Sequence, residues 1–245
     1  MRNIKLLIEY DGTDFVGWQV QPKGRTVQGE ITGVLSRVLQ EPISLIGAGR
    51  TDTGVHARGQ VANFRTVSTI APDALLRALG GMLSDDVVVH SVDEVPETFH
   101  ARYDARERVY RYYISFRSSA IGRSYRWHMP YRLDLELMKA AALGVEGTHD
   151  FESFSKNGSE VDHYRCHVKT SRWKQDGENL VYEICADRFM RGMVRLLVGT
   201  MVDVGRGHQS LDSFQQLLEE RDRSKSGMAA PPHGLFLEEV LYGGR

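Results

Sequence analysis

The sequence predicts an α+β fold of two ferredoxin-like halves, whose split β-α-β units join into a mainly antiparallel sheet with helices on one face and a central cleft. The first observation is that strand-like and helix-like segments follow one another in the order β-α-β-β-α-β. The second is that a similar order returns later in the chain. We therefore expect an N-terminal half at residues 1–100 and a C-terminal half at residues 101–245.

Turn and capping residues mark the elements of the first half. Asp11 and Gly12 form a turn signal after a strand-like segment. Thr26 can cap a helix whose apolar residues recur at helical spacing, and Pro72 can begin another helix. The expected elements are a strand at 3–10, a helix from 27 to about 38, a strand near 43–48, a strand at 59–65, a helix from 72 to about 83 and a strand at 87–92.

The second half is read in the same way, with a hairpin turning at Asp176-Gly177. Two connections, 117–131 and 146–165, are long for loops, which is typical of functional segments. The expected elements are a strand at 108–116, a helix from 134 to about 143, a hairpin over 166–187, a helix from 190 to about 204, a helix after 210 and a strand at 235–242.

The composition predicts a globular protein, and we expect it to act in the cytoplasm. Of 245 residues, 41% are apolar and 26% are charged, and no apolar run reaches the length that spans a membrane. The chain starts with a strand-like segment and not with a signal peptide, and it has only two cysteines, Cys166 and Cys185. Cys166 has His163 and His167 nearby but no second ligand pair, so we expect no metal site.

Positive charge is concentrated although the net charge is only -1. Between residues 100 and 132, eight arginines stand against Asp104 and Glu107 and alternate with tyrosines. Arginine binds phosphate bidentately and stacks on bases, so this stretch favours an RNA partner; the alternative is a solvated strand face followed by a loop. The arginines are Arg102, Arg106, Arg108, Arg111, Arg117, Arg123, Arg126 and Arg132.

The strongest candidate for chemistry is Asp52, in a polar, glycine-rich loop between two strand-like runs. Arg50 and Arg58 lie close in sequence and would favour the ionised carboxylate. An ionised carboxylate can attack an electron-poor carbon or stabilise a developing cation. The alternative is an Asx-type turn in which Asp52 caps backbone amides and the arginines are solvated.

Three residues of the second half are also candidates. Tyr110 alternates with apolar residues along its strand, so core packing is the favoured interpretation from the residues alone. Arg191 and Arg195 are expected one helical turn apart, beside an apolar stripe. Such a pair is found on solvated helix faces and also along the walls of clefts.

A set of short segments, spread in order over nearly the whole chain, carries a family resemblance. The segments are Tyr10-Asp11-Gly12-Thr13, Gly17-Trp18-Gln19, Thr26-Val27-Gln28, Gly49-Arg50-Thr51-Asp52, Gly54-Val55-His56-Ala57, Gly59-Gln60-Val61, Tyr110-Arg111-Tyr112, Gly147-Thr148-His149-Asp150-Phe151, Met193-Val194-Arg195, Val198-Gly199 and Gly234-Leu235-Phe236-Leu237. Through these segments the chain resembles the bacterial tRNA pseudouridine synthase A family. Family members usually have alanine at the position of Thr53, which affects the packing of the loop but not its carboxylate.

The resemblance implies a homodimer that needs no cofactor and isomerises uridine to pseudouridine in the anticodon arm of tRNA, at about positions 38 to 40, after flipping the base. By similarity Asp52 is the catalytic carboxylate, and Arg195 pairs with it. Arg50 helps to displace and hold the flipped base, and Tyr110 stacks on the uracil. We expect His56, Arg58 and Arg191, with the arginines between residues 102 and 132 and the loop 147–156, to contact the RNA.

Other functions fit parts of the same pattern. A non-catalytic RNA-binding protein could use the same basic and aromatic strands. A glycosylase could also direct a carboxylate at the C1′ atom of ribose. A pseudouridine synthase could act at other positions of tRNA. Release of the C5 proton, release of free uracil and the map of modified sites distinguish these alternatives.

Overall fold

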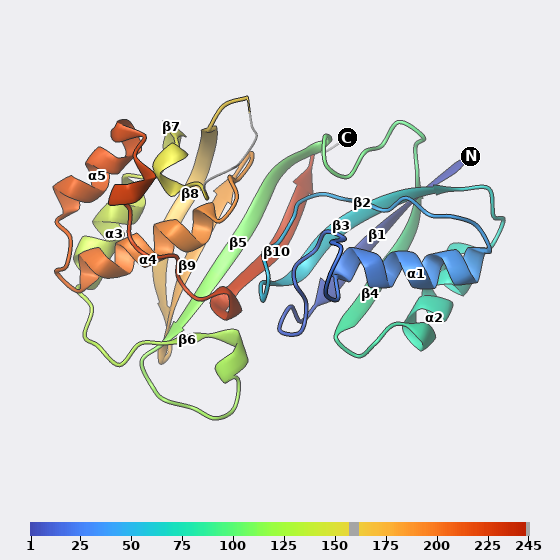
Figure 1. Ribbon diagram of the computed structural model, residues 1–245, viewed down its shortest axis with the longest axis horizontal. Helices are drawn as coiled ribbons and strands as arrows, with labels where there is room; N and C mark the ends of the chain where they lie inside the picture. Colours follow the sequence, from blue (N-terminus) through green and yellow to red (C-terminus); the bar gives the residue numbers. More distant parts are fainter. Residues whose placement is uncertain (157–161, 244–245) are drawn as a thin grey trace. The chain divides into compact units, whose positions relative to one another are not determined.

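A computed structural model describes residues 1–156 and 162–243, and the chain divides into two compact units (Figure 1). Unit 1 contains Met1–Arg106 and the C-terminal residues from Phe236, and unit 2 contains Glu107–Leu235. Both units combine helices with strands that pair mostly in antiparallel fashion, so the α+β class is confirmed. The central cleft expected between two halves stays a prediction.

The sheet of unit 1 has the strand order β4-β1-β3, with β2 and β10 also on β3. β1 lies antiparallel to β3 and β4, and β2 lies antiparallel to β3, as in a split β-α-β unit. β10 runs parallel to β3, with Phe236 opposite His56. The strands are β1 (Arg2–Tyr10), β2 (Ile46–Gly47), β3 (His56–Thr66), β4 (Val87–Val95) and β10 (Leu235–Tyr242).

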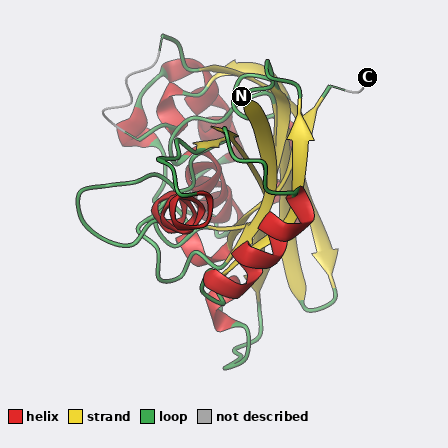
Figure 2. Cartoon of the chain, turned by 90° about the vertical axis from the view of Figure 1, so that its right-hand side faces the viewer, coloured by secondary structure: helices red, strands yellow, loops and turns green. Residues whose placement is uncertain are grey.

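Two helices cover one face of this sheet, as Figure 2 shows. α1 (Val27–Leu39) begins after Thr26, whose hydroxyl accepts a hydrogen bond from the Gly29 amide at 3.2 Å. α2 (Pro72–Met82) has proline in its first turn, where the missing N–H costs nothing. Leu35 and Leu79, one on each helix, are completely buried. Thr26 caps α1 and Pro72 begins α2, as the sequence predicts.

Unit 2 contains an antiparallel sheet in the order β5-β9-β8-β7, with β6 parallel to β5, and its described residues also form the helices α3, α4 and α5. The hairpin of β8 and β9 turns at Asp176–Gly177, where Gly177 has a φ of 58°. The elements are β5 (Ala105–Ser115), β6 (Trp127–His128), β7 (Gly147–Asp150), β8 (Arg165–Asp176), β9 (Asn179–Ala186), α3 (Leu135–Leu143), α4 (Met193–Gly205) and α5 (Leu211–Glu220).

Three local expectations were wrong. The apolar run near 43–48 forms only the two-residue strand β2, in which Gly47 lies against the Trp18 ring. The segment 147–156 is not a loop: it contains β7 and a turn of 3₁₀ helix at Glu152–Phe154. α4 begins at Met193, three residues later than expected, because Gly192 has a φ of 74° and cannot continue a helix.

Candidate active site

Asp52 lies on the loop between β2 and β3, at the end of the unit 1 sheet, and is half-buried. The Val55 amide donates a hydrogen bond to the Asp52 carbonyl oxygen at 3.1 Å, which closes a tight turn. Gly54 occupies the turn position with a φ of 73°, a conformation that favours glycine. The main chain therefore holds this turn and places Asp52 just before the start of β3.

The residues on either side of Asp52 are tied to the segment 10–18. The hydroxyls of Tyr10 and Thr51 are 2.7 Å apart and both residues are buried. The Trp18 amide donates to the Thr51 carbonyl at 3.2 Å, and the Thr53 hydroxyl donates to the carbonyl of Val16 at 3.0 Å. Because the neighbours on both sides are anchored, the Asp52 backbone is preorganised.

Two glycines allow the segment 10–18 to approach this loop. A Cβ atom on Gly12 would lie 2.1 Å from the Val55 carbonyl oxygen. A Cβ atom on Gly17 would lie 2.7 Å from the Thr51 carbonyl oxygen, and Gly17 has a φ of 110°. Both distances are too short for any side chain, so these two positions require glycine.

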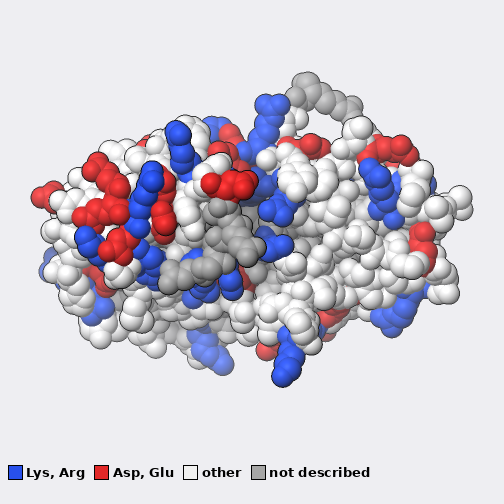
Figure 3. All heavy atoms as spheres, turned by 45° about the horizontal axis from the view of Figure 1, so that its top comes forward, with Lys and Arg blue, Asp and Glu red and all other residues white. Residues whose placement is uncertain are grey.

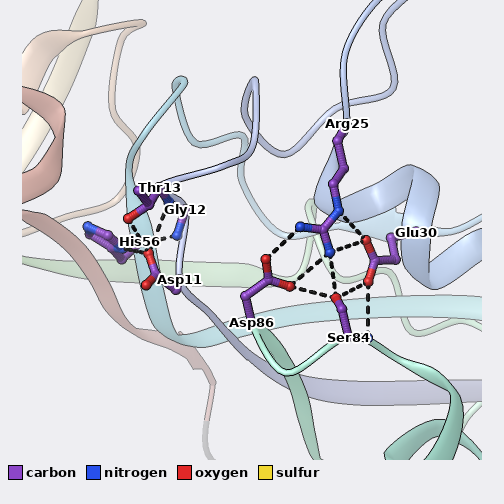
Figure 4. A network of polar contacts seen from close by, with 8 residues as sticks. All are labelled: Asp11, Gly12, Thr13, Arg25, Glu30, His56, Ser84 and Asp86. Carbon is purple, nitrogen blue, oxygen red and sulfur yellow. Dashed lines mark hydrogen bonds and ion pairs between the residues drawn. The ribbon is translucent and has the colours of Figure 1, made fainter. Parts of the chain in front are cut away.

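His56 is buried at the base of the loop, with only 1% of its side chain exposed (Figure 4). Its Nδ1 accepts a hydrogen bond from the Gly12 amide at 3.0 Å. A ring nitrogen that accepts a hydrogen bond carries no proton, so the Asp11 carboxylate oxygen, 3.0 Å from Nδ1, is a neighbour and not the acceptor of a proton from Nδ1. The ring also stacks on Phe236, with centroids 4.6 Å apart. His56 thus supports the turn that lies against the Asp52 loop.

Arg25 links the segment 10–18, through Phe15, to Asp86, the residue before β4 (Figure 4). Its guanidinium donates to both carboxylate oxygens of Asp86, at 2.6 and 2.9 Å, and to Glu30 at 2.7 Å. It also lies over the Phe15 ring, 4.2 Å from the centroid. Burial raises the pKa of Asp86, but the hydrogen bonds from Arg25 and Ser84 outweigh burial and leave the pKa below its usual value.

The two arginines near Asp52 in sequence have different surroundings. Arg50 is exposed on the loop itself. Arg58 pairs with Glu238 at 2.7 Å and lies over the Phe236 ring, 4.6 Å from its centroid. The Arg58 guanidinium is therefore held across β10, although almost half of the side chain remains exposed.

Tyr110, in unit 2, is 8% exposed and sits on β5 opposite Ile184 of β9. Its ring meets Phe189 edge to face, with centroids 5.0 Å apart and an interplanar angle of 81°. The ring is thus packed among neighbours of its own unit, as its alternation along the strand suggests. Its stacking on a uracil stays a prediction.

Arg195 and Arg191 do not share a helical face, so the expected pair was wrong. Arg195 lies half-buried in the first turn of α4, and its Nε donates to the Ala230 carbonyl at 2.7 Å. The Ala230 amide in turn donates to the Arg195 carbonyl at 2.9 Å. Arg191 is exposed ahead of the helix, and Gly192 turns the chain between the two.

Charges on the surface of unit 2 are mixed, and Figure 3 shows basic and acidic side chains close together on its visible face. Arg111 pairs with Glu183 at 2.8 Å, and Arg117 lies 3.4 Å from Glu178. Carboxylates of β9 and of the hairpin turn thus neutralise part of the positive charge of the stretch 102–132. RNA contacts by residues 102–132 stay a prediction.

Within the described part of the chain, no three His, Cys, Asp or Glu residues are grouped so that they could hold a metal ion. Cys166 is buried, and burial raises its pKa to about 12.

No described helix combines the length and the apolar character needed to cross a bilayer.

Several residues of the Asp52 site were not among the candidates. Tyr10, Gly12 and Gly17 belong to the segments that carry the family resemblance, so the signal was present without a role attached to it. The contact between Arg25 and Asp86 joins residues 61 positions apart, and no local pattern indicates it.

Known proteins match this chain along almost its whole length. The sequence model of the family described as tRNA pseudouridine synthase matches residues 6–104 and 141–243. "tRNA pseudouridine synthase A" of Exiguobacterium sp. is 41% identical over 242 residues, which cover 99% of this chain and 98% of that protein. The protein of the same name from Acetivibrio thermocellus is 43% identical over 244 residues, 99% of this chain and 100% of that protein. A solved structure titled "Crystal Structure of a Cbf5-Nop10-Gar1 Complex" aligns with a TM-score of 0.36 and 10% identity, covering 81% of this chain and 45% of that chain.

Proposed function

The chain belongs to the tRNA pseudouridine synthase family and is an isomerase that converts uridine to pseudouridine in tRNA; we propose that Asp52 supplies the catalytic carboxylate. The observation that carries this proposal is the anchored loop. Thr51 and Thr53 are hydrogen-bonded to the segment 10–18, while Asp52 between them remains partly exposed at the end of the sheet. A carboxylate that must meet one carbon atom of a substrate benefits from such preorganisation.

The isomerisation can proceed with an ionised carboxylate such as that of Asp52. The bond between ribose C1′ and uracil N1 breaks, the base turns, and C1′ joins C5 of the same base. C5 then loses its proton and N1 gains one, so substrate and product are isomers. An ionised Asp52 can act by attack at C1′ or by assisting a glycal-type route, and both routes require the carboxylate to be fixed close to the sugar.

The family resemblance suggests roles for the other site residues. We propose that Arg50, exposed beside Asp52, helps to hold the flipped base, and that Tyr110 stacks on the uracil. Arg58 and Arg191 are assigned to RNA contact, and Arg195 to keeping the carboxylate ionised. His56 was expected to contact the RNA, but its ring is buried and accepts a hydrogen bond from the Gly12 amide, so we assign it a supporting role instead.

We propose that the substrate region is the anticodon arm, at about positions 38 to 40, where a paired uridine must be flipped out at a cost of a few kcal/mol. RNA helices are recognised mainly through backbone and shape, which suits an enzyme that accepts several neighbouring positions. We further propose that the protein acts as a homodimer, in the cytoplasm and without a cofactor. Mapping the modified sites by carbodiimide treatment and reverse transcription tests the positions.

Tritium release from tRNA labelled at C5 of uridine tests the role of Asp52. We expect release with the wild-type protein, no detectable release with Asp52→Asn, and the same affinity for tRNA in both. Asp85→Asn is the matched control, because Asp85 is an exposed aspartate of the same unit. A glycosylase would liberate free uracil, and an RNA-binding protein without activity would release neither. Full turnover by Asp52→Asn would refute the proposal.

A further inference from the structure

The loop 96–104, which follows β4, carries the most exposed tyrosine ring of the residues described in unit 1. Tyr103 is 76% exposed. The His100 ring lies against it, with centroids 4.3 Å apart and an interplanar angle of 31°. The Arg102 guanidinium carbon is 5.8 Å from the Tyr103 ring centroid. An imidazole, a phenol and a guanidinium thus gather on one short turn.

This turn is rigid because His100 closes it from both ends. The amides of Arg102 and Tyr103 both donate to the His100 Nδ1, each at 3.2 Å. The Asp104 amide donates to the His100 carbonyl at 3.0 Å, and the His100 amide donates to the Asp104 carboxylate at 2.8 Å. The imidazole is therefore fixed by the backbone, and the tyrosine ring rests on a fixed surface.

Two buried asparagines fasten the turn to the sheet. The Asn63 side chain accepts a hydrogen bond from the Ala101 amide at 2.9 Å and donates to the Asn3 side chain at 2.9 Å. Asn3 donates to the carbonyl of Phe99 at 2.8 Å. The Tyr242 hydroxyl donates to the Ala101 carbonyl at 2.7 Å. Because Asn3 and Asn63 are almost fully buried, this anchoring is shielded from water and the turn is preorganised.

We propose that Tyr103, backed by His100 and flanked by Arg102, is a stacking platform for an unpaired base of the tRNA. Unpaired bases bind to proteins by stacking on aromatic rings and guanidinium planes, and a rigid ring loses little entropy when a base stacks on it. Charge alone does not make this an RNA site, since Glu97 and Asp104 belong to the same loop. The exposed aromatic ring, with 76% of the residue accessible, is the feature that selects a base and not a phosphate.

The platform lies at the end of the sheet opposite to Asp52. Asn3 pairs with Arg65 of β3 at one end of β1, and Tyr10 pairs with Ala57 at the other end, beside the Asp52 loop. Tyr10 is seven steps along the strand from Asn3, which is about 23 Å. The stacked base is therefore remote from the uridine that reacts. The platform contributes to binding, so its loss raises KM and leaves kcat unchanged.

Four variants of Tyr103 test the platform, measured as Kd for a tRNA transcript at fixed salt and as KM and kcat for tritium release. We expect Tyr103→Ala to raise Kd and KM about 5- to 100-fold. Tyr103→Phe and Tyr103→Trp, which keep a flat ring, should bind as the wild type does. Tyr103→Leu keeps apolar area without a π-face and should bind as weakly as Tyr103→Ala. All four should melt at the wild-type temperature, because the side chain is exposed.

A blunt RNA duplex of the same length provides the second measurement, because it offers no unpaired base. Its affinity should be the same for the wild type and for Tyr103→Ala. Unchanged tRNA affinity of Tyr103→Ala, recovery of affinity by Tyr103→Leu, or equal weakening for the duplex would each overturn the platform. The inference rests on the proposed function, because it takes tRNA as the ligand. The two can still fail separately: the Asp52→Asn variant tests turnover, and the Tyr103 variants test the affinity for tRNA.

Discussion

Substituting Gly17 by alanine should damage the active site while leaving the sheet intact. Gly17 lies in the segment that supports the Asp52 loop and has a φ of 110°, which alanine adopts only under strain. Its added Cβ would lie 2.7 Å from the Thr51 carbonyl oxygen and 3.3 Å from the Asp52 carbonyl carbon. The new methyl group therefore pushes directly on the residues that carry the carboxylate.

The size of the effect follows from these distances. An ordinary contact begins at 3.4 Å, so the loop or the Gly17 segment must move by about 0.7 Å. A misplacement of about 1 Å can reduce catalysis about 100-fold, so we expect kcat to fall about 10- to 100-fold. Backbone strain and the contact together should lower the free energy of unfolding by about 1–3 kcal/mol.

Gly33→Ala is the matched control, since Gly33 is in α1, is exposed and has no atom within 4 Å of the built Cβ. The same chemical change there should raise the free energy of unfolding by about 0.5–1 kcal/mol and leave kcat unchanged. Tritium release and urea unfolding measure both quantities. Wild-type kcat in Gly17→Ala would refute the reasoning, and so would an activity loss that the fraction unfolded accounts for completely.

Three further predictions concern stability. Tyr10→Phe removes the partner of the buried Thr51 hydroxyl and should cost about 1–3 kcal/mol in urea unfolding; a cost near zero would show that this hydroxyl finds another partner. Asp86→Asn should lower the free energy of unfolding by about 0.5–1 kcal/mol at pH 7, a modest amount because the pair with Arg25 is partly exposed. Since the pKa of Asp86 lies below 3.8 in the folded protein, this difference in stability should persist above pH 3.8 and vanish as the pH falls through the folded pKa. Burial lowers the pKa of His233 below 6.5, so wild-type stability should be complete above pH 6.5 and decline below it, and His233→Asn should flatten this decline in unfolding curves recorded between pH 7.5 and 5.5.

Local patterns were sufficient for most of the fold. Thr26 caps α1, Pro72 begins α2, and β10 covers the residues 235–242 that the sequence predicts as the last strand. Glycine and polar residues between two strand-like runs placed Asp52 on a loop at a sheet edge. These features depend on residues within a few positions of one another, so the sequence alone contains them.

Contacts between distant segments depend on how the strands pair, and only the tertiary structure decides them. Gly17 must be glycine because the segment 10–18 lies against Thr51, more than thirty positions later in the chain. The Tyr103 turn is rigid because β1 and β3 bring Asn3 and Asn63 together beneath it. A sequence pattern records the preference of each residue for a backbone conformation and for burial. Which atoms then meet is decided by strand register and close packing, which no short window of residues contains.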